Sequence, residues 1–262
     1  MPTPRNISVL KAFALLKSFS HPDECLTCVE LSRRARLPEA SCLRLLYTLE
    51  EIGAVVRVGR KGYRPGLALI SLSSNVAVAD CLREAGLAII NDLSRRLDVT
   101  VNIGMLQGGM VTYVAKAATP TSCPTHARIG DQFEPYCSGL GKVLLAALPP
   151  FQLDHFVQDA LVALTPHTIT DRATLLSELD TVRKCGYALD NRETSMDMIC
   201  LAVPITNGDG QVVAAMSAAE RRDAFTPERR ADLQTELLAA AAAAGRRAFP
   251  ESSTLLTRKG MR

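Results

Sequence analysis

Eight cysteines and four histidines are the residues of this 262-residue chain whose side chains could support nucleophilic, redox or metal chemistry. Cys25 and Cys28 form a single C-x-x-C. A zinc site needs a second pair of Cys or His ligands, and a thioredoxin-like motif needs a surrounding βαβ unit, but neither follows in the sequence. The other cysteines are scattered through a chain too long to need disulfide staples, which indicates reduced thiols.

Cys200 stands within an apolar run, ICLAVPI, where a buried cysteine behaves as a small hydrophobic residue. No histidine is placed in the sequence so as to activate it. The motifs G-x-S-x-G, H-E-x-x-H and the P-loop are absent from the sequence. We therefore predict no catalytic residue, no metal ligand and no cofactor.

The positive charge of the chain is concentrated at its N-terminal end. Residues 1–66 contain 11 Lys and Arg against 6 Asp and Glu, whereas residues 67–262 contain 19 against 21. A basic segment of this kind indicates a polyanionic partner, with an ordinary solvated surface as the alternative. With 47% hydrophobic residues the chain is typical of a globular protein, and its length favours two domains.

No apolar stretch approaches the roughly 20 residues that a membrane-spanning helix requires. The N-terminal sequence MPTPRNISVLKAF also lacks the apolar core and cleavage site of a secretory signal. We expect no membrane partner and a cytoplasmic location.

Helical signals dominate the first 53 residues. Apolar residues at helical spacing predict a first helix over 6–19. Thr27 and Glu30 have the spacing of a capping box, which predicts a second helix over 28–34. A third helix is expected to start with Pro38 at its first helical position and to end near residue 53.

The third helix should have a buried stripe and an exposed face with hydrogen-bond donors. The predicted buried residues are Cys42, Leu45, Leu46, Leu49 and Ile52, and the predicted exposed residues are Ala40, Ser41, Arg44, Tyr47, Thr48 and Glu51. A hairpin follows, with a β-branched strand over 54–58, a glycine-flanked turn over 59–62 and a short edge strand ended by Pro65. This order predicts a winged helix-turn-helix, whose helix fits the DNA major groove.

The rest of the chain alternates helical and strand patterns. A helical stretch from residue 67, with small polar residues at 73–75, predicts a linker helix followed by a second helix. A β-hairpin is predicted from 99–106 and 110–117, and strands near 187, over 199–205 and over 212–217. Helices are expected from residue 138, over 171–185 and over 227–248, and the tail 250–262 is expected to be disordered.

Several fragments resemble one known family in their order and spacing. They are LSRRARLPEASCLRLLYTLEEIGAV, GYRPG, EPYCSGLGKVLLA, TPHTITD, VRKCGYALDNRE, MICLAVPI and GQVVAAMS. Together they are similar to the IclR family of bacterial transcriptional regulators over nearly the whole chain. The sequence departs from the family pattern at Glu39 and Ala40, where a basic or small residue and then Ser or Thr are common. The departure affects the choice of operator sequence rather than DNA binding.

The resemblance implies an α+β fold made of a winged helix-turn-helix domain, a linker helix and a GAF-like α/β effector domain. We assign these to residues 1–66, 67–80 and 81–249. It also implies a homodimer or dimer of dimers, a double-stranded DNA operator, and a small carboxylate or aromatic acid as effector, often in the control of catabolic genes.

Candidate DNA contacts fall into two groups. Ser41, Arg44 and Tyr47 share the exposed face of the third helix and have the donors that base edges require. The remaining cations are expected to hold phosphate, which positions the protein without specifying sequence. These residues are Arg33, Arg34, Arg36, Arg57, Arg60 and Lys61.

A candidate effector site begins at Ser138, where a helix start could bind a carboxylate with free backbone amides. An ordinary serine N-cap is the alternative. Arg128 could also pair with a carboxylate, or bridge surface strands. With the resemblance, the predicted effector residues are Arg128, Ile129, Tyr136, Ser138, Gly139, Leu140, Gly141, Asp190, Met198, Cys200 and Ser217.

Two other functions compete with effector-responsive transcriptional regulation. A GAF-like cysteine redox enzyme would use Cys123, Cys137 and Cys200, but would have no use for residues 27–66. A DNA-compacting structural protein would explain the basic domain, but would leave the α/β domain without a role.

Overall fold

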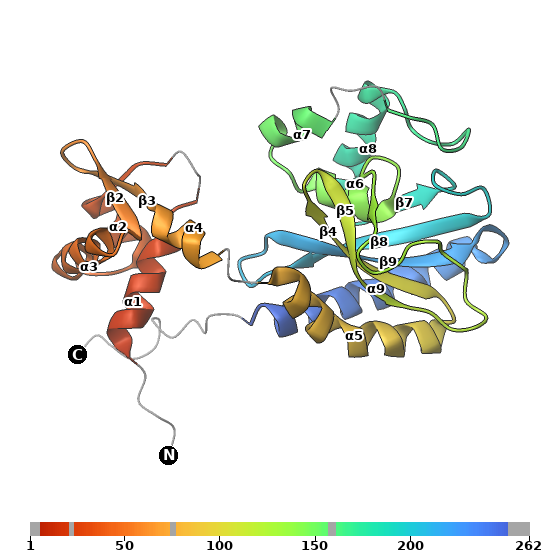
Figure 1. Ribbon diagram of the computed structural model, residues 1–262, viewed down its shortest axis with the longest axis horizontal. Coiled ribbons are helices and arrows are strands. Elements are labelled where there is room, and N and C mark those ends of the chain that lie inside the picture. The colour runs from red at the N-terminus through yellow and green to blue at the C-terminus, as the bar shows by residue number, and fades with distance from the viewer. Residues whose placement is uncertain (1–5, 21–23, 74–76, 157–160, 251–262) are drawn as a thin grey trace, which may run out of the picture. The chain divides into compact units, whose positions relative to one another are not determined.

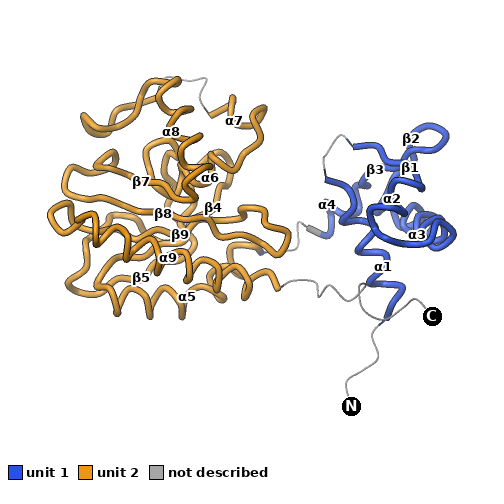
Figure 2. The backbone as a smooth tube through the Cα atoms, turned by 180° about the vertical axis from the view of Figure 1, so that it is seen from behind, with its two compact units in different colours: residues 1–77 blue, residues 78–262 orange. Residues whose placement is uncertain are grey.

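The computed structural model of the chain describes residues 6–20, 24–73, 77–156 and 161–250. The chain divides into two units, Met1–Ala77 and Val78–Arg262, which are coloured separately in Figure 2. Each unit has its own hydrophobic core. Residues 74–76, within the predicted linker, and the predicted disordered tail after residue 250 lie outside the described residues.

Unit 1 is a helix-turn-helix followed by a wing (Figure 1). Buried leucines from successive helices, Leu15, Leu31 and Leu46, meet in its core. A three-stranded antiparallel sheet has the strand order β1-β3-β2. The elements are α1 (Ile7–Leu16), β1 (Leu26–Thr27), α2 (Cys28–Ala35), α3 (Glu39–Glu51), β2 (Val55–Val58), β3 (Gly62–Pro65) and α4 (Leu67–Ser73).

The predicted capping box starts α2. The Thr27 hydroxyl accepts from the Glu30 amide at 3.3 Å, and the Glu30 carboxylate accepts from the Thr27 amide at 2.8 Å. Arg36 ends α2 in the left-handed conformation, with φ of 55°. This turn directs the chain into α3, and the Ser32 hydroxyl fixes it by donating to the Leu37 carbonyl at 2.5 Å.

Several details of the α3 prediction were wrong. Ser41, predicted to be exposed, and Leu45, predicted to be buried, are both partly buried. Pro38 is the N-cap of α3 rather than its first helical residue: its ψ is 139°, and its carbonyl accepts from the Cys42 amide. Glu39 therefore takes the first helical position, where its negative charge interacts favourably with the helix dipole. Ile52 is 61% exposed rather than buried, because α3 ends at Glu51 and the chain turns away.

Unit 2 is built on a six-stranded sheet with the order β6-β5-β4-β9-β8-β7, in which every neighbouring pair is antiparallel. Its strands are β4 (Thr100–Gln107), β5 (Met110–Ala117), β6 (Gln132–Phe133), β7 (Ala188–Asn191), β8 (Met198–Thr206) and β9 (Val212–Arg221). This arrangement confirms the predicted α+β class, with a helix-turn-helix unit and a separate α/β unit.

Helices cover both faces of this sheet (Figure 1). On one face α5 and α9 pack against Val101, Ile103 and Met216. On the other face α6 lies directly on the sheet, and α8 packs against α6. The helices of unit 2 are α5 (Val78–Leu97), α6 (Gly139–Ala146), α7 (Pro150–Phe156), α8 (Arg172–Cys185), the 3-10 turn η1 (Arg222–Ala224) and α9 (Pro227–Ala248).

Candidate functional site

The exposed face of α3 carries the predicted base contacts. Arg44 is exposed near the middle of the helix, and Tyr47 is 59% exposed one turn further on. Ser41 is partly buried on the first turn. The opposite side of the helix is anchored by Cys42, Leu46 and Leu49, which are buried in the core of unit 1. A rigid helix therefore presents the guanidinium of Arg44 and the phenol of Tyr47 to solvent.

Arg57 connects the wing to α3. Its guanidinium lies 5.9 Å from the centre of the Tyr47 ring and 5.1 Å from that of Tyr63, within the range of cation–π contacts. It also pairs with Glu50 of α3 at 3.4 Å. These contacts fix the position of the wing relative to the exposed face of α3.

The other predicted phosphate contacts differ in their surroundings. Arg33 and Arg36 are exposed at the end of α2, and Arg60 and Lys61 are exposed at the tip of the wing. Arg34 pairs with Glu24 at 2.7 Å and donates to the Ser18 carbonyl at 3.0 Å, so it links α2 to the preceding loop. Part of its charge is therefore balanced within unit 1.

In unit 2, strand alternation places a row of polar residues on the α6 face of the sheet. Val101, Ile103 and Met216 point into the core with α5 and α9, so their neighbours Asn102 and Ser217 point to the opposite face. Asn102 and Ser217 are cross-strand partners on β4 and β9, and both are buried, at 3% exposure. Ala202 of β8 is the cross-strand partner of Ser217 and extends this row across the sheet with an apolar residue.

The first turn of α6 lies next to this row. Ser138 is the N-cap, and its hydroxyl accepts from the Gly141 amide at 3.1 Å. A Cβ atom added at Gly139 would lie 3.2 Å from the Ala202 Cβ and 3.4 Å from the Cys200 carbonyl. The amides of Gly139 and Leu140 belong to the first turn, where no acceptor exists within the helix. The start of α6 thus lies against β7 and β8, close to Asp190 and Cys200.

The loop of residues 122–127 covers part of the same sheet face, where β4 begins and β5 ends. The Thr100 hydroxyl donates to the Cys123 carbonyl at 2.5 Å, which ties this loop to β4. The Lys116 ammonium donates to the carbonyls of Thr125 and Ala127 at 2.9 and 2.8 Å, which ties it to β5. Desolvation and the nearby charge of Arg128 lower the pKa of Lys116. The segment 122–127 is therefore fixed over the face that carries Asn102.

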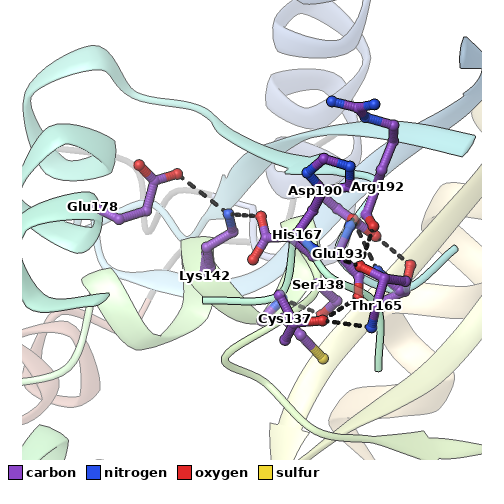
Figure 3. A network of polar contacts seen from close by, with 12 residues as sticks. Cys137, Ser138, Lys142, Thr165, His167, Glu178, Asp190, Arg192 and Glu193 are labelled. Carbon is purple, nitrogen blue, oxygen red and sulfur yellow. Dashed lines mark hydrogen bonds and ion pairs between the residues drawn. The ribbon is translucent and has the colours of Figure 1, made fainter. Parts of the chain in front are cut away.

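A buried ion pair holds α6 on its other side (Figure 3). The Lys142 side chain is 1% exposed, and its ammonium lies 2.5 Å from Glu193 Oε1 and 3.2 Å from Glu178 Oε1. The second oxygen of Glu193, Oε2, is buried and has no hydrogen-bond partner in the described structure. Burial raises the pKa of Glu193, and the charge of Lys142 opposes this shift.

Asp190 organises the loop after β7. It accepts from the Glu193 amide at 2.7 Å, from the Thr194 amide at 3.2 Å and from the Thr194 hydroxyl. Burial raises its pKa, and these hydrogen bonds oppose the shift. The carboxylate is thus occupied by the turn, beside the first turn of α6.

The structure brings together most of the predicted effector residues, but not all of them. Asp190, Cys200 and Ser217 lie on or beside the sheet near the start of α6, whereas Arg128 and Ile129 are exposed on a turn at the edge of β5. The Tyr136 hydroxyl bonds to the backbone of residue 162. Leu140 and Gly141 are buried within α6, and Met198 is partly buried at the start of β8.

The three thiols that a cysteine redox enzyme would use, Cys123, Cys137 and Cys200, are poor nucleophiles. Desolvation raises the pKa of Cys137 to about 12, and it also raises the pKa values of Cys123 and Cys200. The thiolate is the reactive form, so these surroundings disfavour redox chemistry at neutral pH. The described residues hold no group of three or more His, Cys, Asp or Glu able to bind a metal ion. Among them there is also no helix long and apolar enough to cross a membrane.

Sequence reasoning missed Asn102, Lys116 and the Lys142–Glu193 pair. Asn102 had a signal: it is a polar residue between two apolar ones in VTVNIGML, on a strand with helices on both faces. The pairing of Lys142 had none, because its partners lie 36 and 51 positions away in the sequence.

Fold and site define a class: a DNA-binding protein with a winged helix-turn-helix unit and an α/β effector unit. The comparisons identify the family. The model of the IclR helix-turn-helix domain matches residues 8–59, and that of the bacterial transcriptional regulator IclR C-terminal matches residues 75–246. The chain therefore belongs to the IclR family of bacterial transcriptional regulators.

Individual relatives agree with this assignment. The chain is 31% identical to the HTH-type transcriptional regulator Rv1719 of Mycobacterium tuberculosis, over 88% of each chain. It is 30% identical to XynR of Escherichia coli, over 80% of this chain and 84% of the relative. In fold it is similar to an IclR homolog from Microbacterium hydrocarbonoxydans complexed with 4-hydroxybenzoate, with a TM-score of 0.61 at 22% identity, over 92% of this chain and 98% of the other.

Proposed function

We propose that this regulator binds an operator through α3 and the wing, and that a small organic or aromatic acid bound in unit 2 controls this binding. The observation that carries the proposal is the pairing of two sites in one chain. Unit 1 presents Arg44 and Tyr47 on a helix braced by the wing. Unit 2 has a helix start and buried polar groups on one sheet face.

The DNA-binding role is assigned by the chemistry of each residue. Arg44 and Tyr47 read base edges in the major groove, with Ser41 on the same helix face. Arg33, Arg36, Arg60 and Lys61 hold phosphates, and Arg57 sets the angle between wing and helix. We also propose a cytoplasmic location, because the operator DNA of a bacterium lies in the cytoplasm.

Replacing Arg44 by Ala is the direct test of the base contact. We expect Arg44→Ala to lower specific operator affinity by about 1–3 kcal/mol, because it removes the bidentate hydrogen bonds to a base. Nonspecific binding and the thermal stability should be nearly unchanged, since the side chain is exposed. Gel shifts with the operator and with a scrambled duplex measure the two affinities. Equal decreases in affinity for both duplexes would contradict a base-reading role.

The effector is proposed to bind with its carboxylate at the amides of Gly139 and Leu140, beside Cys200. Backbone donors at the positive end of a helix are suited to an anion. Catabolic gene control follows from this class of ligand, because small organic and aromatic acids are carbon sources.

We further propose a homodimer, which can pair as a dimer of dimers. Exposed apolar side chains lie on α1 (Val9 50%, Phe13 61%) and on α4 (Leu67 77%, Leu72 67%), two helices that are neighbours in Figures 1 and 2. An apolar surface of this kind supports association with a second copy. A two-fold dimer then matches a palindromic operator.

A further inference from the structure

Two buried polar atoms have no hydrogen-bond partner where the loop 122–127 covers the sheet, one on the sheet and one in the loop. Asn102 Oδ1, on the sheet, has no hydrogen-bond partner in the described structure, and neither has Thr125 Oγ1, in the loop above it. Buried polar groups are nearly always hydrogen-bonded, because an unpaired one loses its bonds to water without replacement. These two atoms therefore mark a place where a polar partner is missing.

Lys116 is a neighbour of both residues that carry the unpaired oxygens. It is the cross-strand partner of Asn102 on β5, and its ammonium donates to the carbonyl of Thr125 itself. Asn102 and Lys116 both point to this face, because the flanking residues of each lie in the core with α5 and α9. Asn102 and Thr125, the residues that carry the two unpaired oxygens, are thus both neighbours of Lys116.

The hydrogen-bonding properties of Asn102, Lys116 and Thr125 favour a ligand hydroxyl group. Asn102 Oδ1 is an acceptor and needs a donor, whereas the Lys116 ammonium is a donor and the Thr125 hydroxyl can donate or accept. A ligand hydroxyl satisfies all of them, since it donates one bond and accepts others. A carboxylate in this position would set its acceptor oxygens against Asn102 Oδ1.

We propose that Asn102 and Thr125 form a hydroxyl-binding subsite, so that the effector is a hydroxylated carboxylic acid. The inference rests on the proposed function, since the start of α6 is the carboxylate end. The two ends are separated by two strand spacings, from Ala202 on β8 across β9 to Asn102 on β4, or about 10 Å. A one-ring or six-carbon hydroxy acid, with a hydrogen bond at each end, has this reach.

The test compares ligands that differ only in the hydroxyl. Calorimetry on the full chain is carried out with benzoate and 4-hydroxybenzoate, and with hexanoate and 6-hydroxyhexanoate. We expect the hydroxylated member of at least one pair to bind about tenfold more tightly, because the acid without it leaves both orphan atoms unpaired. In Asn102→Leu and in Thr125→Val this preference should fall to about onefold.

Three further measurements make the result decisive. Asn102→Leu should raise the Tm of the ligand-free protein, because it removes an unpaired buried amide oxygen. Gly139→Pro, which removes one backbone amide at the start of α6 and adds a ring close to Ala202, should weaken both members of a pair equally. Asn91→Leu, an exposed substitution of the same kind on α5, should change neither the affinity nor the preference.

Each other outcome overturns the inference. An unchanged preference in Asn102→Leu means that a water molecule satisfies the orphan atoms. Equal binding of both members of each pair by the wild type removes the subsite while leaving the carboxylate site in place. Binding of no acid contradicts the proposed effector site, and the subsite with it.

Discussion

Lys142→Met is expected to lower the stability of unit 2 by about 3–5 kcal/mol, because it leaves the Glu193 carboxylate buried without a counter-ion. Glu178 is 32% exposed and can turn to solvent, but Glu193 is 4% exposed and cannot. The decrease corresponds to a fall in Tm on the order of 10 °C for a unit of this size. Thermal unfolding followed by circular dichroism measures it.

The pH dependence of this decrease has a definite sign. In Lys142→Met the pKa of Glu193 stays above its unfolded value, since burial raises it and the opposing charge of Lys142 is gone. A raised carboxyl pKa gives a contribution that is present below the unfolded pKa and is lost as pH rises through the folded pKa. The variant should therefore be closer to the wild type at pH 5 than at pH 8.

Two matched variants separate the effect of the buried charge from that of the altered packing. Lys142→Met combined with Glu193→Gln should recover most of the stability, because no ion is then left unpaired. Lys184→Met, an exposed change on α8, should cost less than about 0.5 kcal/mol. A single variant as stable as the wild type at pH 8 would show that the pair does not hold α6 in place.

Operator affinity should fall by about 10³ to 10⁵ between 50 and 200 mM salt, if a dimer neutralises 6–10 phosphates. Each subunit carries exposed cations in two parts of the proposed DNA-binding surface. They are Arg33 and Arg36 at the end of α2, and Arg60 and Lys61 at the tip of the wing. Phosphate contacts release condensed counterions, so the logarithm of affinity falls linearly with the logarithm of salt concentration. Fluorescence anisotropy across a salt series gives the slope.

The wing contribution is measured with Arg60→Ala combined with Lys61→Ala. The slope should become shallower by about 0.9 for each phosphate that the variant no longer neutralises, while the preference for operator over scrambled DNA is kept. Arg246→Ala combined with Arg247→Ala, at the end of α9, should leave the slope unchanged. If the wing variant has the wild-type slope, the wing does not bind phosphate.

The sequence predictions were most accurate where they depended on local signals. The capping box at Thr27 placed the start of α2, and the predicted limits of the last helix, 227–248, are those of α9. These features depend on residues within a few positions of each other. Strand β1 was missed because it exists only through its pairing with Tyr63 and Gly62 of β3, and α7 is too short to show a clear period.

The candidate effector site depended on long-range pairing to a greater degree. The helix start at Ser138 was visible in the sequence, whereas the row of Asn102, Ser217 and Ala202 is assembled by strand order β4-β9-β8. Strand order is not encoded locally, so the side chains that share a face with α6 could not be derived from spacing. Arg128 was predicted from its residue type and from the family resemblance, and the structure places it on an exposed turn.

The central claim is that ligand binding in unit 2 and operator binding in unit 1 are coupled. The direct measurement is the operator Kd of the full chain with and without a saturating amount of the tightest-binding acid of the paired series, together with the acid's Kd with and without operator. We predict that both affinities change by the same factor, about 5- to 150-fold, because coupling of 1–3 kcal/mol is reciprocal. Affinities for operator and for acid that are each identical with and without the other partner would contradict the claim.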